Sequence, residues 1–211
     1  MVASTLAKVE GNVLAALELP HEDQRLIDDY LGGRDNAREH LVASAFWAKT
    51  MAHQDGRSSM AMFNLLAEIK ALKGSGKSIE LDCIGGPLAP GRDDKGMFNR
   101  LTDIKSFHPP DWAMVYVGDA QAAYLERGDG ASVGALMRPS KPWIVGISAS
   151  CGTIWACGKN GRCGVMPIAQ GDFMKGADLE VESEGGTSVD SALRLPAFTA
   201  LRPPVSACEL R

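Results

Sequence analysis

The sequence has no apolar run long enough to cross a membrane and no excess of basic side chains. Its 211 residues carry a formal charge of -4, with 22 Lys and Arg against 26 Asp and Glu. A spanning helix requires about 20 consecutive apolar residues, and contacts with the phosphates of nucleic acids require clustered cations. We therefore expect neither a membrane protein nor a nucleic-acid-binding protein.

The N-terminal segment lacks the pattern of a secretory signal, because Lys8, Glu10 and Asn12 interrupt its apolar side chains. This predicts a cytoplasmic protein as synthesised, and leaves open export by a route without such a signal. Cysteine is scarce and odd in number, at 5 residues. In a reducing compartment these cysteines are thiols, metal ligands or redox centres rather than structural disulfides.

The hydrophobic pattern divides the chain into a helical part, 1–72, a β-rich part, 78–200, and a loose tail, 201–211. The apolar side chains near the N-terminus recur every three or four positions, as on one face of a helix; they are Leu6, Val9, Val13, Leu14 and Leu17. From Ser78 onward, short β-prone runs separated by Gly and Pro replace this spacing. We predict one α+β domain, 1–211, with a helical N-terminal third packed on a mainly antiparallel sheet.

Within this plan the first helix extends from Ser4 to the residue before Pro20, and a second helix ends at Gly32. Other helices are predicted at 36–53, 58–72 and 95–106. The predicted strands are 79–84, 112–117, 123–126, 143–148, 153–157, 162–168, 179–183 and 193–199.

Residues 71–78, Ala-Leu-Lys-Gly-Ser-Gly-Lys-Ser, end like a phosphate-binding P-loop, although Ala71 stands where that motif has glycine. A P-loop leads from a strand into the start of a helix, whose N–H groups hold the phosphates. Here apolar residues at helical spacing precede the glycines, and the alternation of apolar and polar residues from Ser78 onward is typical of a strand. We interpret the segment as a helix-to-strand turn that binds no nucleotide.

A candidate nucleophile lies after another apolar run, residues 143–147. Small residues follow this run and lead to Cys151 and Gly152. Rigid strand ends often display reactive side chains. Gly152 leaves space beside the sulfur, and the N–H groups of Cys151 and Gly152 could stabilise an oxyanion. The pattern therefore predicts Cys151 as a nucleophile.

A thiol nucleophile needs a proton acceptor or a positive neighbour. We favour His108 as the base of Cys151, because it lies in a loop just before a predicted strand. Asp111 or Asp119 would orient the imidazole, and Arg162 is the alternative source of positive charge. The resulting hypothesis is a thiol hydrolase or acyltransferase that uses no cofactor and no metal.

The alternative hypothesis is a non-enzymatic structural or protein-binding subunit of a larger assembly. Free cysteine is often buried as a small apolar residue, and under this hypothesis Cys151 is one of these. Under both hypotheses the expected partner is a protein or peptide. The sequence determines neither the substrate nor the oligomeric state.

Cys157 and Cys163 flank Asn160-Gly161, a pair typical of tight hairpin turns. A hairpin would bring the two cysteines close enough for a disulfide under oxidising conditions. The alternative is a zinc site in which Cys157 and Cys163 bind the metal together with Cys151 and a histidine. Five residues separate each of these cysteines from the next, however, whereas two to four separate the paired ligands of standard zinc knuckles. We predict the hairpin without a metal.

Overall fold

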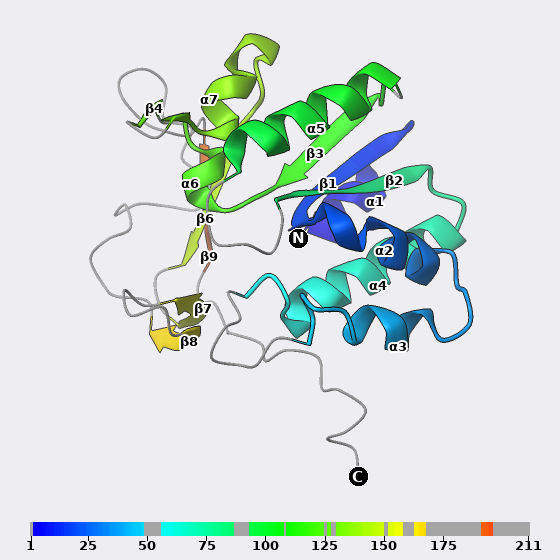
Figure 1. Cartoon of the computed structure of the whole chain (residues 1–211). Coiled ribbons are helices and arrows are strands. Elements are labelled where there is room, and N and C mark those ends of the chain that lie inside the picture. Colours follow the sequence, from blue (N-terminus) through cyan, green and yellow to red (C-terminus); the bar gives the residue numbers. More distant parts are fainter. Residues whose placement is uncertain are drawn as a thin grey trace.

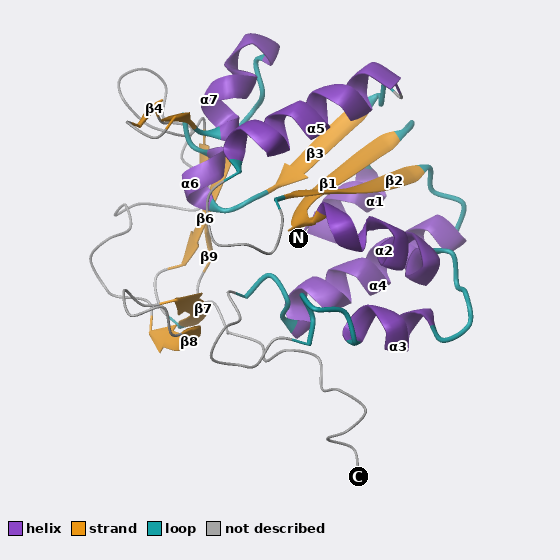
Figure 2. Ribbon diagram, in the orientation of Figure 1, coloured by secondary structure: helices purple, strands orange, loops and turns teal. Residues whose placement is uncertain are grey.

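Three parallel strands form the centre of the structure, which is a computed structural model. The structure describes residues 2–48, 56–86, 93–107, 109–124, 126–127, 130–149, 152–157, 163–167 and 191–195. Strands β1 (Val13–Pro20), β2 (Ile79–Gly85) and β3 (Trp112–Tyr116) lie in the order β2-β1-β3 (Figure 2). All three run in the same direction. The prediction of a mainly antiparallel sheet is therefore wrong.

The central strand β1 occupies a segment for which the sequence predicts a helix. Helix α1 covers only Val2–Lys8, and Gly11, with a φ of 85°, interrupts the helical path before β1 begins. The first five residues of β1 are all buried. A strand covered on both faces is a continuous apolar run, which fits the spacing of a helix as well as that of a strand. The predicted first helix is therefore wrong beyond α1.

On one face of the sheet lie four helices from the N-terminal part of the chain (Figure 1). They are α1, α2 (Gln24–Leu31), α3 (Ala37–Val42) and α4 (Met60–Gly74). Their apolar side chains form one core with alternate residues of β1, including Val13, Ala15 and Leu17.

The other face of the sheet is covered by α5 (Asp94–Phe107) and α7 (Val133–Met137), as Figure 1 shows. Leu14 and Ala16 of β1 belong to this second core, together with Met97 and Leu101 of α5. Helices therefore continue well beyond residue 72. The predicted arrangement, in which a helical N-terminal third packs on the sheet, is therefore wrong, and the sheet lies between two helical layers.

The two connections between the parallel strands pass on opposite faces of the sheet. The chain from β1 to β2 passes through the 3-10 helix η1 (His21–Asp23) and then α2 to α4, whereas the chain from β2 to β3 passes through α5. Because β1 lies between β2 and β3, the chain leaves the carboxyl end of β1 toward β2 and away from β3, so the carboxyl ends of β1 and β3 form a switch point. In open α/β sheets, ligands bind outside the carboxyl ends of the strands at such a switch point.

The C-terminal half adds smaller elements. They are α6 (Asp119–Ala122), β4 (Glu126–Arg127), β5 (Gly130–Ala131), η3 (Arg138–Ser140), β6 (Val145–Ala149), β7 (Thr153–Cys157), β8 (Cys163–Pro167) and β9 (Ser191–Leu195). Strands β6 and β9 are parallel, whereas β4 with β5 and β7 with β8 are antiparallel. The predicted strand 179–183 and the predicted tail 201–211 lie outside the described residues.

The glycines between α4 and β2 form the predicted helix-to-strand turn. Helix α4 ends at Gly74 and β2 begins at Ile79, which is the reverse of the order in a P-loop. The ammonium group of Lys77 donates to the carbonyl oxygen of Ala7 at 3.3 Å and to that of Val9. Lys77 therefore has a structural role, in that it holds the C-terminal end of α1 against this turn.

Candidate functional site

Glu18 is a charged residue of β1 that lies close to the carboxyl end of this strand. Its side chain is only 13% exposed. One carboxylate oxygen accepts a hydrogen bond from Nη1 of Arg57 at 3.0 Å, and the other accepts from the backbone N–H of Gly118 at 2.8 Å. Glu18 thereby joins β1 to the segment after β3 and to the residues before α4. Its carboxylate is held in one orientation by two different partners.

Arg57 is positioned by an aromatic ring as well as by this ion pair. Its guanidinium carbon lies 6.0 Å from the centre of the Phe46 ring, a distance at which a cation is attracted to the face of the ring. Phe46 is buried. The cation of Arg57 therefore lies between a fixed carboxylate and a fixed ring, beside the carboxyl end of β1.

His21 follows β1 directly and provides a titratable ring at the same edge. Its Nδ1 lies 3.3 Å from the carbonyl oxygen of Gly85, at the end of β2, and 3.4 Å from Oε2 of Glu22. In the neutral tautomer that donates from Nδ1 to either oxygen, Nε2 carries a lone pair and can accept a proton. The side chain is 44% exposed, so a dissolved molecule can reach the ring.

Glycine at position 85 allows β2 to end against β1. A Cβ at this position would lie 2.6 Å from the carbonyl oxygen of Leu19, a distance that backbone atoms do not tolerate. The register between β1 and β2 also shifts between Leu17 and Pro20. The close approach of the two strand ends places the carbonyl oxygen of Gly85 within reach of His21.

A second ion pair lies beyond the end of β2. Arg100 of α5 donates from Nη2 to Oδ2 of Asp93 at 2.5 Å and from Nε to the carbonyl oxygen of Ile84 at 2.8 Å. A Cβ on Gly86 would lie 2.6 Å from the Cβ of Asp93, so glycine is required for this approach. The carboxyl ends of β1 and β2 are thus each associated with one arginine–carboxylate pair.

Asp23 supports the short helix that carries His21. It is buried, with 8% of its surface exposed, and it accepts a hydrogen bond from the Ser44 hydroxyl at 2.9 Å. Burial raises the pKa of Asp23 above its ordinary value of 3.8, the bond from Ser44 partly opposes this shift, and the charge of Glu22 adds to it. Asp23 therefore links η1 to the segment after α3.

The sequence-predicted site residues are only partly within the described structure. Cys151 and His108 lie outside the described residues. Asp119 begins α6, directly after Gly118, but its side chain is not among those described. Gly152 has a φ of 113°, a backbone conformation that residues with a Cβ rarely adopt.

Asp111 and Asp119, the two predicted orienting carboxylates, lie at opposite ends of β3. The five residues of this strand span about 17 Å. Asp111 lies at the amino end, where its Oδ2 accepts from the backbone N–H of Asn12 at 2.8 Å. One site can therefore use Asp111 or Asp119 but not both.

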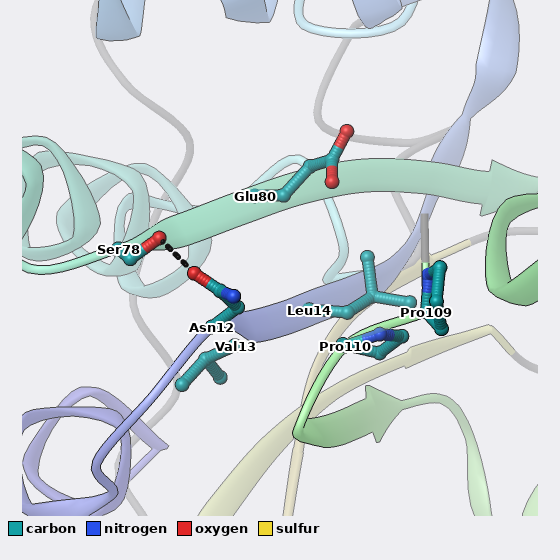
Figure 3. Close-up of a pocket in the computed structure, with 7 residues that line it drawn as sticks. All are labelled: Asn12, Val13, Leu14, Ser78, Glu80, Pro109 and Pro110. Atoms are coloured by element: carbon teal, nitrogen blue, oxygen red, sulfur yellow. Dashed lines mark hydrogen bonds between the residues drawn. The ribbon is translucent and has the colours of Figure 1, made fainter. Parts of the chain in front are cut away.

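A cavity at the amino edge of the sheet is the alternative location for a ligand. Its volume is about 320 Å³, and Figure 3 shows the residues that line it: Asn12, Val13, Leu14, Ser78, Glu80, Pro109 and Pro110. The Ser78 hydroxyl donates to Oδ1 of Asn12 at 2.8 Å, and the carbonyl oxygen of Asn12 accepts from the N–H groups of Asp111 and Trp112. These polar groups bond to one another and hold the strand starts together. We therefore favour the carboxyl edge as the place where a ligand binds.

Two kinds of site receive no support from the described residues. They contain no group of three or more His, Cys, Asp or Glu side chains placed to hold a metal ion. None of the helices in these segments has both the length and the apolar character needed to cross a membrane.

Sequence reasoning missed Glu18, His21, Arg57, Asp93 and Arg100 as site residues. The available signal was the position of Glu18 and His21, two polar residues that follow the apolar run 13–17. If this run is interpreted as a strand, these residues mark its end. Interpreting this run as part of a helix concealed the signal. Comparison of the chain with family models, curated proteins and solved structures gave no match.

Proposed function

We propose that the protein is a hydrolase of a small polar molecule, which it binds at the carboxyl edge of the sheet, beside the end of β1. The observation that carries this proposal is the carboxylate of Glu18, held by Arg57 and by the N–H of Gly118 at the switch point. Parallel α/β sheets bind their ligands at such points. His21, three residues further along the chain, supplies a ring suited to proton transfer.

In the proposed reaction, Nε2 of His21 accepts a proton from water as the water oxygen attacks an acyl carbon of the substrate. The tetrahedral intermediate then collapses, the bond from the acyl carbon to the leaving oxygen or nitrogen breaks, and His21 returns the proton to that leaving atom. In the tautomer in which Nδ1 donates to the carbonyl oxygen of Gly85, the lone pair lies on Nε2. The guanidinium group of Arg57 provides positive charge near the negative charge that develops on the substrate oxygen. Glu18 is a positioning residue in this scheme, because it acts through Arg57.

Hydrolysis of p-nitrophenyl acetate by the full chain tests this proposal. We expect His21→Gln to lower kcat/KM by about 100-fold, the usual size of a general-base contribution. His40→Gln is the matched control, because His40 is an exposed histidine on α3, and it should leave kcat/KM unchanged. Equal rates for wild type and His21→Gln would contradict the proposal.

The thiol hydrolase or acyltransferase hypothesis remains a second proposal. Its support is Gly152, which follows Cys151 directly and has a φ of 113°. Glycine adopts this backbone conformation readily and leaves space beside the sulfur. In this scheme Cys151 attacks the substrate, His108 is the base, and Asp111 or Asp119 orients the imidazole. Protein and peptide substrates or partners belong to this proposal and to the alternative of a non-enzymatic subunit.

The substitution Cys151→Ala separates the two enzymatic proposals. Loss of hydrolysis with unchanged stability would favour the thiol, whereas loss only in His21→Gln would favour the carboxyl edge. Iodoacetamide labelling below pH 7 gives a second readout, because an activated thiol reacts faster than an ordinary one. Unchanged hydrolysis in both variants would leave the non-enzymatic subunit as the remaining hypothesis.

A further inference from the structure

Cys157 and Cys163 lie directly opposite one another in the hairpin formed by β7 and β8. Cys157 is the last residue of β7, Cys163 is the first residue of β8, and the two are paired in the antiparallel register. Opposed residues of antiparallel strands have Cα atoms about 4.5 to 5.5 Å apart. Disulfide-bonded cysteines have Cα atoms about 4.4 to 6.8 Å apart. The register therefore places both residues within the range that a disulfide requires.

We infer that Cys157 and Cys163 form a dithiol site that reacts with small-molecule disulfides, such as glutathione disulfide, and closes to an internal disulfide. This inference rests on the hairpin register and is independent of the hydrolase proposal. It assigns a redox modification to a part of the chain that lies far in sequence from Glu18 and His21.

The surroundings of the hairpin leave room for such a reagent. A Cβ added to Gly164, the neighbour of Cys163, would meet no atom within 4 Å, and the side chain of Val165 is 53% exposed. Ala156 faces Gly164 in the adjacent pair, so the residues next to the two cysteines are both small. A small disulfide can therefore approach this end of the hairpin.

Cys83 provides an internal contrast. It lies in β2 and is buried, with 4% of its surface exposed. Burial raises the pKa of the Cys83 thiol well above its usual range, and the charges of Asp23, Asp82 and Asp28 add to this effect. Cys83 therefore remains a protonated, inaccessible thiol under conditions in which the hairpin cysteines react.

The exchange proceeds in two balanced steps. The Cys157 thiolate attacks one sulfur of glutathione disulfide, a mixed disulfide forms, and one glutathione thiolate leaves. The Cys163 thiolate then attacks the protein sulfur of the mixed disulfide, the internal bond forms, and the second glutathione leaves. Two protein thiols lose two electrons to glutathione disulfide, and their two protons are taken up by the two glutathione thiolates.

The experiment incubates the reduced full chain with glutathione disulfide, blocks remaining thiols with iodoacetamide and maps tryptic peptides by mass spectrometry. Trypsin cleaves after Lys159 and Arg162, but not before Pro139 or Pro142, so the internal disulfide links a peptide that contains both Cys151 and Cys157 to a peptide that begins at Cys163. Fragmentation of the linked pair then assigns the bond to Cys157. We expect this linked pair to exceed any glutathione adduct of Cys157 or Cys163 by about tenfold, because the second thiol is held next to the first.

Two variants give the control. In Cys157→Ser and in Cys163→Ser the second step is blocked, so the remaining hairpin cysteine should retain bound glutathione. The inference is overturned if wild type shows both hairpin cysteines alkylated by iodoacetamide. It is also overturned if wild type keeps glutathione on them, or if either is linked instead to Cys151 or Cys208.

Discussion

The amino and carboxyl edges of the parallel sheet use their polar groups in different ways. At the amino edge, Asn12 connects the starts of all three strands: its backbone donates to Asp111 and accepts from Trp112, and its side chain accepts from Ser78. At the carboxyl edge, Glu18 makes a similar connection to Gly118 and Arg57. The carboxyl edge differs in also carrying a half-exposed histidine, His21.

This difference separates residues that align strands from residues that can carry chemistry. The contacts of Asn12 are all with groups that begin or precede strands, so they account for its presence through the fold alone. The ring of His21 contacts its neighbours through Nδ1, and alignment of the strands does not require its second nitrogen. We therefore assign the structural role to the amino edge and the functional role to the carboxyl edge.

The largest expected effect on stability is at Gly85. Substitution Gly85→Ala places a Cβ 2.6 Å from the carbonyl oxygen of Leu19, and we expect it to lower the free energy of unfolding by about 3 kcal/mol. Gly74→Ala is the matched control, since its Cβ would meet no atom within 4 Å. Alanine is a better helix former than glycine, so this control should stabilise α4 by up to about 1 kcal/mol. Urea denaturation measures both changes, and equal effects would contradict the close approach of β1 and β2.

Substitutions of one carboxylate at each edge compare the two edges directly. Glu18→Gln removes the charge that Arg57 contacts, and we expect it to lower the free energy of unfolding by about 1 kcal/mol and kcat/KM by about tenfold. Asp111→Asn keeps an oxygen that can accept from Asn12, so stability should change by less than about 0.5 kcal/mol. Its kcat/KM should equal that of wild type.

The reverse outcome, with activity lost in Asp111→Asn and kept in Glu18→Gln, would contradict the assignment of function to the carboxyl edge. It would instead support the thiol hypothesis, in which Asp111 is a candidate orienting group. The double variant Glu18→Gln, Arg57→Gln tests whether the two residues act together. If the two residues act as a pair, the double variant should lose less activity than the two single losses combined.

A smaller effect is expected for the pH dependence at Asp23. Its pKa is raised in the folded protein, so the native state binds this proton more tightly than the unfolded state does. The resulting destabilisation is absent well below pH 3.8 and develops as the pH rises through the folded pKa. The difference in stability between Asp23→Asn and wild type should therefore shift in favour of the variant as the pH rises from 3 to 7. Urea midpoints at both pH values measure this shift, and a gain restricted to pH 3 would contradict the burial of the carboxyl group.

Local sequence patterns were sufficient to predict the ranges of elements that have one polar and one apolar face, or that have clear turn residues at their ends. Strands β2, β3 and β7 and helix α5 lie within a few residues of the predicted ranges. The run that forms β1 has no polar face, and its alternation is hidden for that reason. Parallel pairing is also invisible locally, because it depends on connections that span whole helices.

The candidate site could not be predicted for the same physical reason. Glu18 contacts Gly118 across a sequence separation of 100 residues, and no short motif records such a contact. The predicted Cys151 site was argued from a strand end that a local pattern does show, and it stays a prediction. Once β1 is recognised as a strand, the same reasoning about strand ends leads to Glu18 and His21.

The most direct test of the central claim is to map ligand binding by NMR on the two edges of the sheet. A panel of small esters and carboxylic acids would be titrated into the isotope-labelled full chain, and backbone amide shifts would be followed. Our account predicts that the shifts cluster at Gly85, Gly86 and Gly118. A cluster at Asn12 and Ser78 would place the ligand at the amino edge and contradict the account.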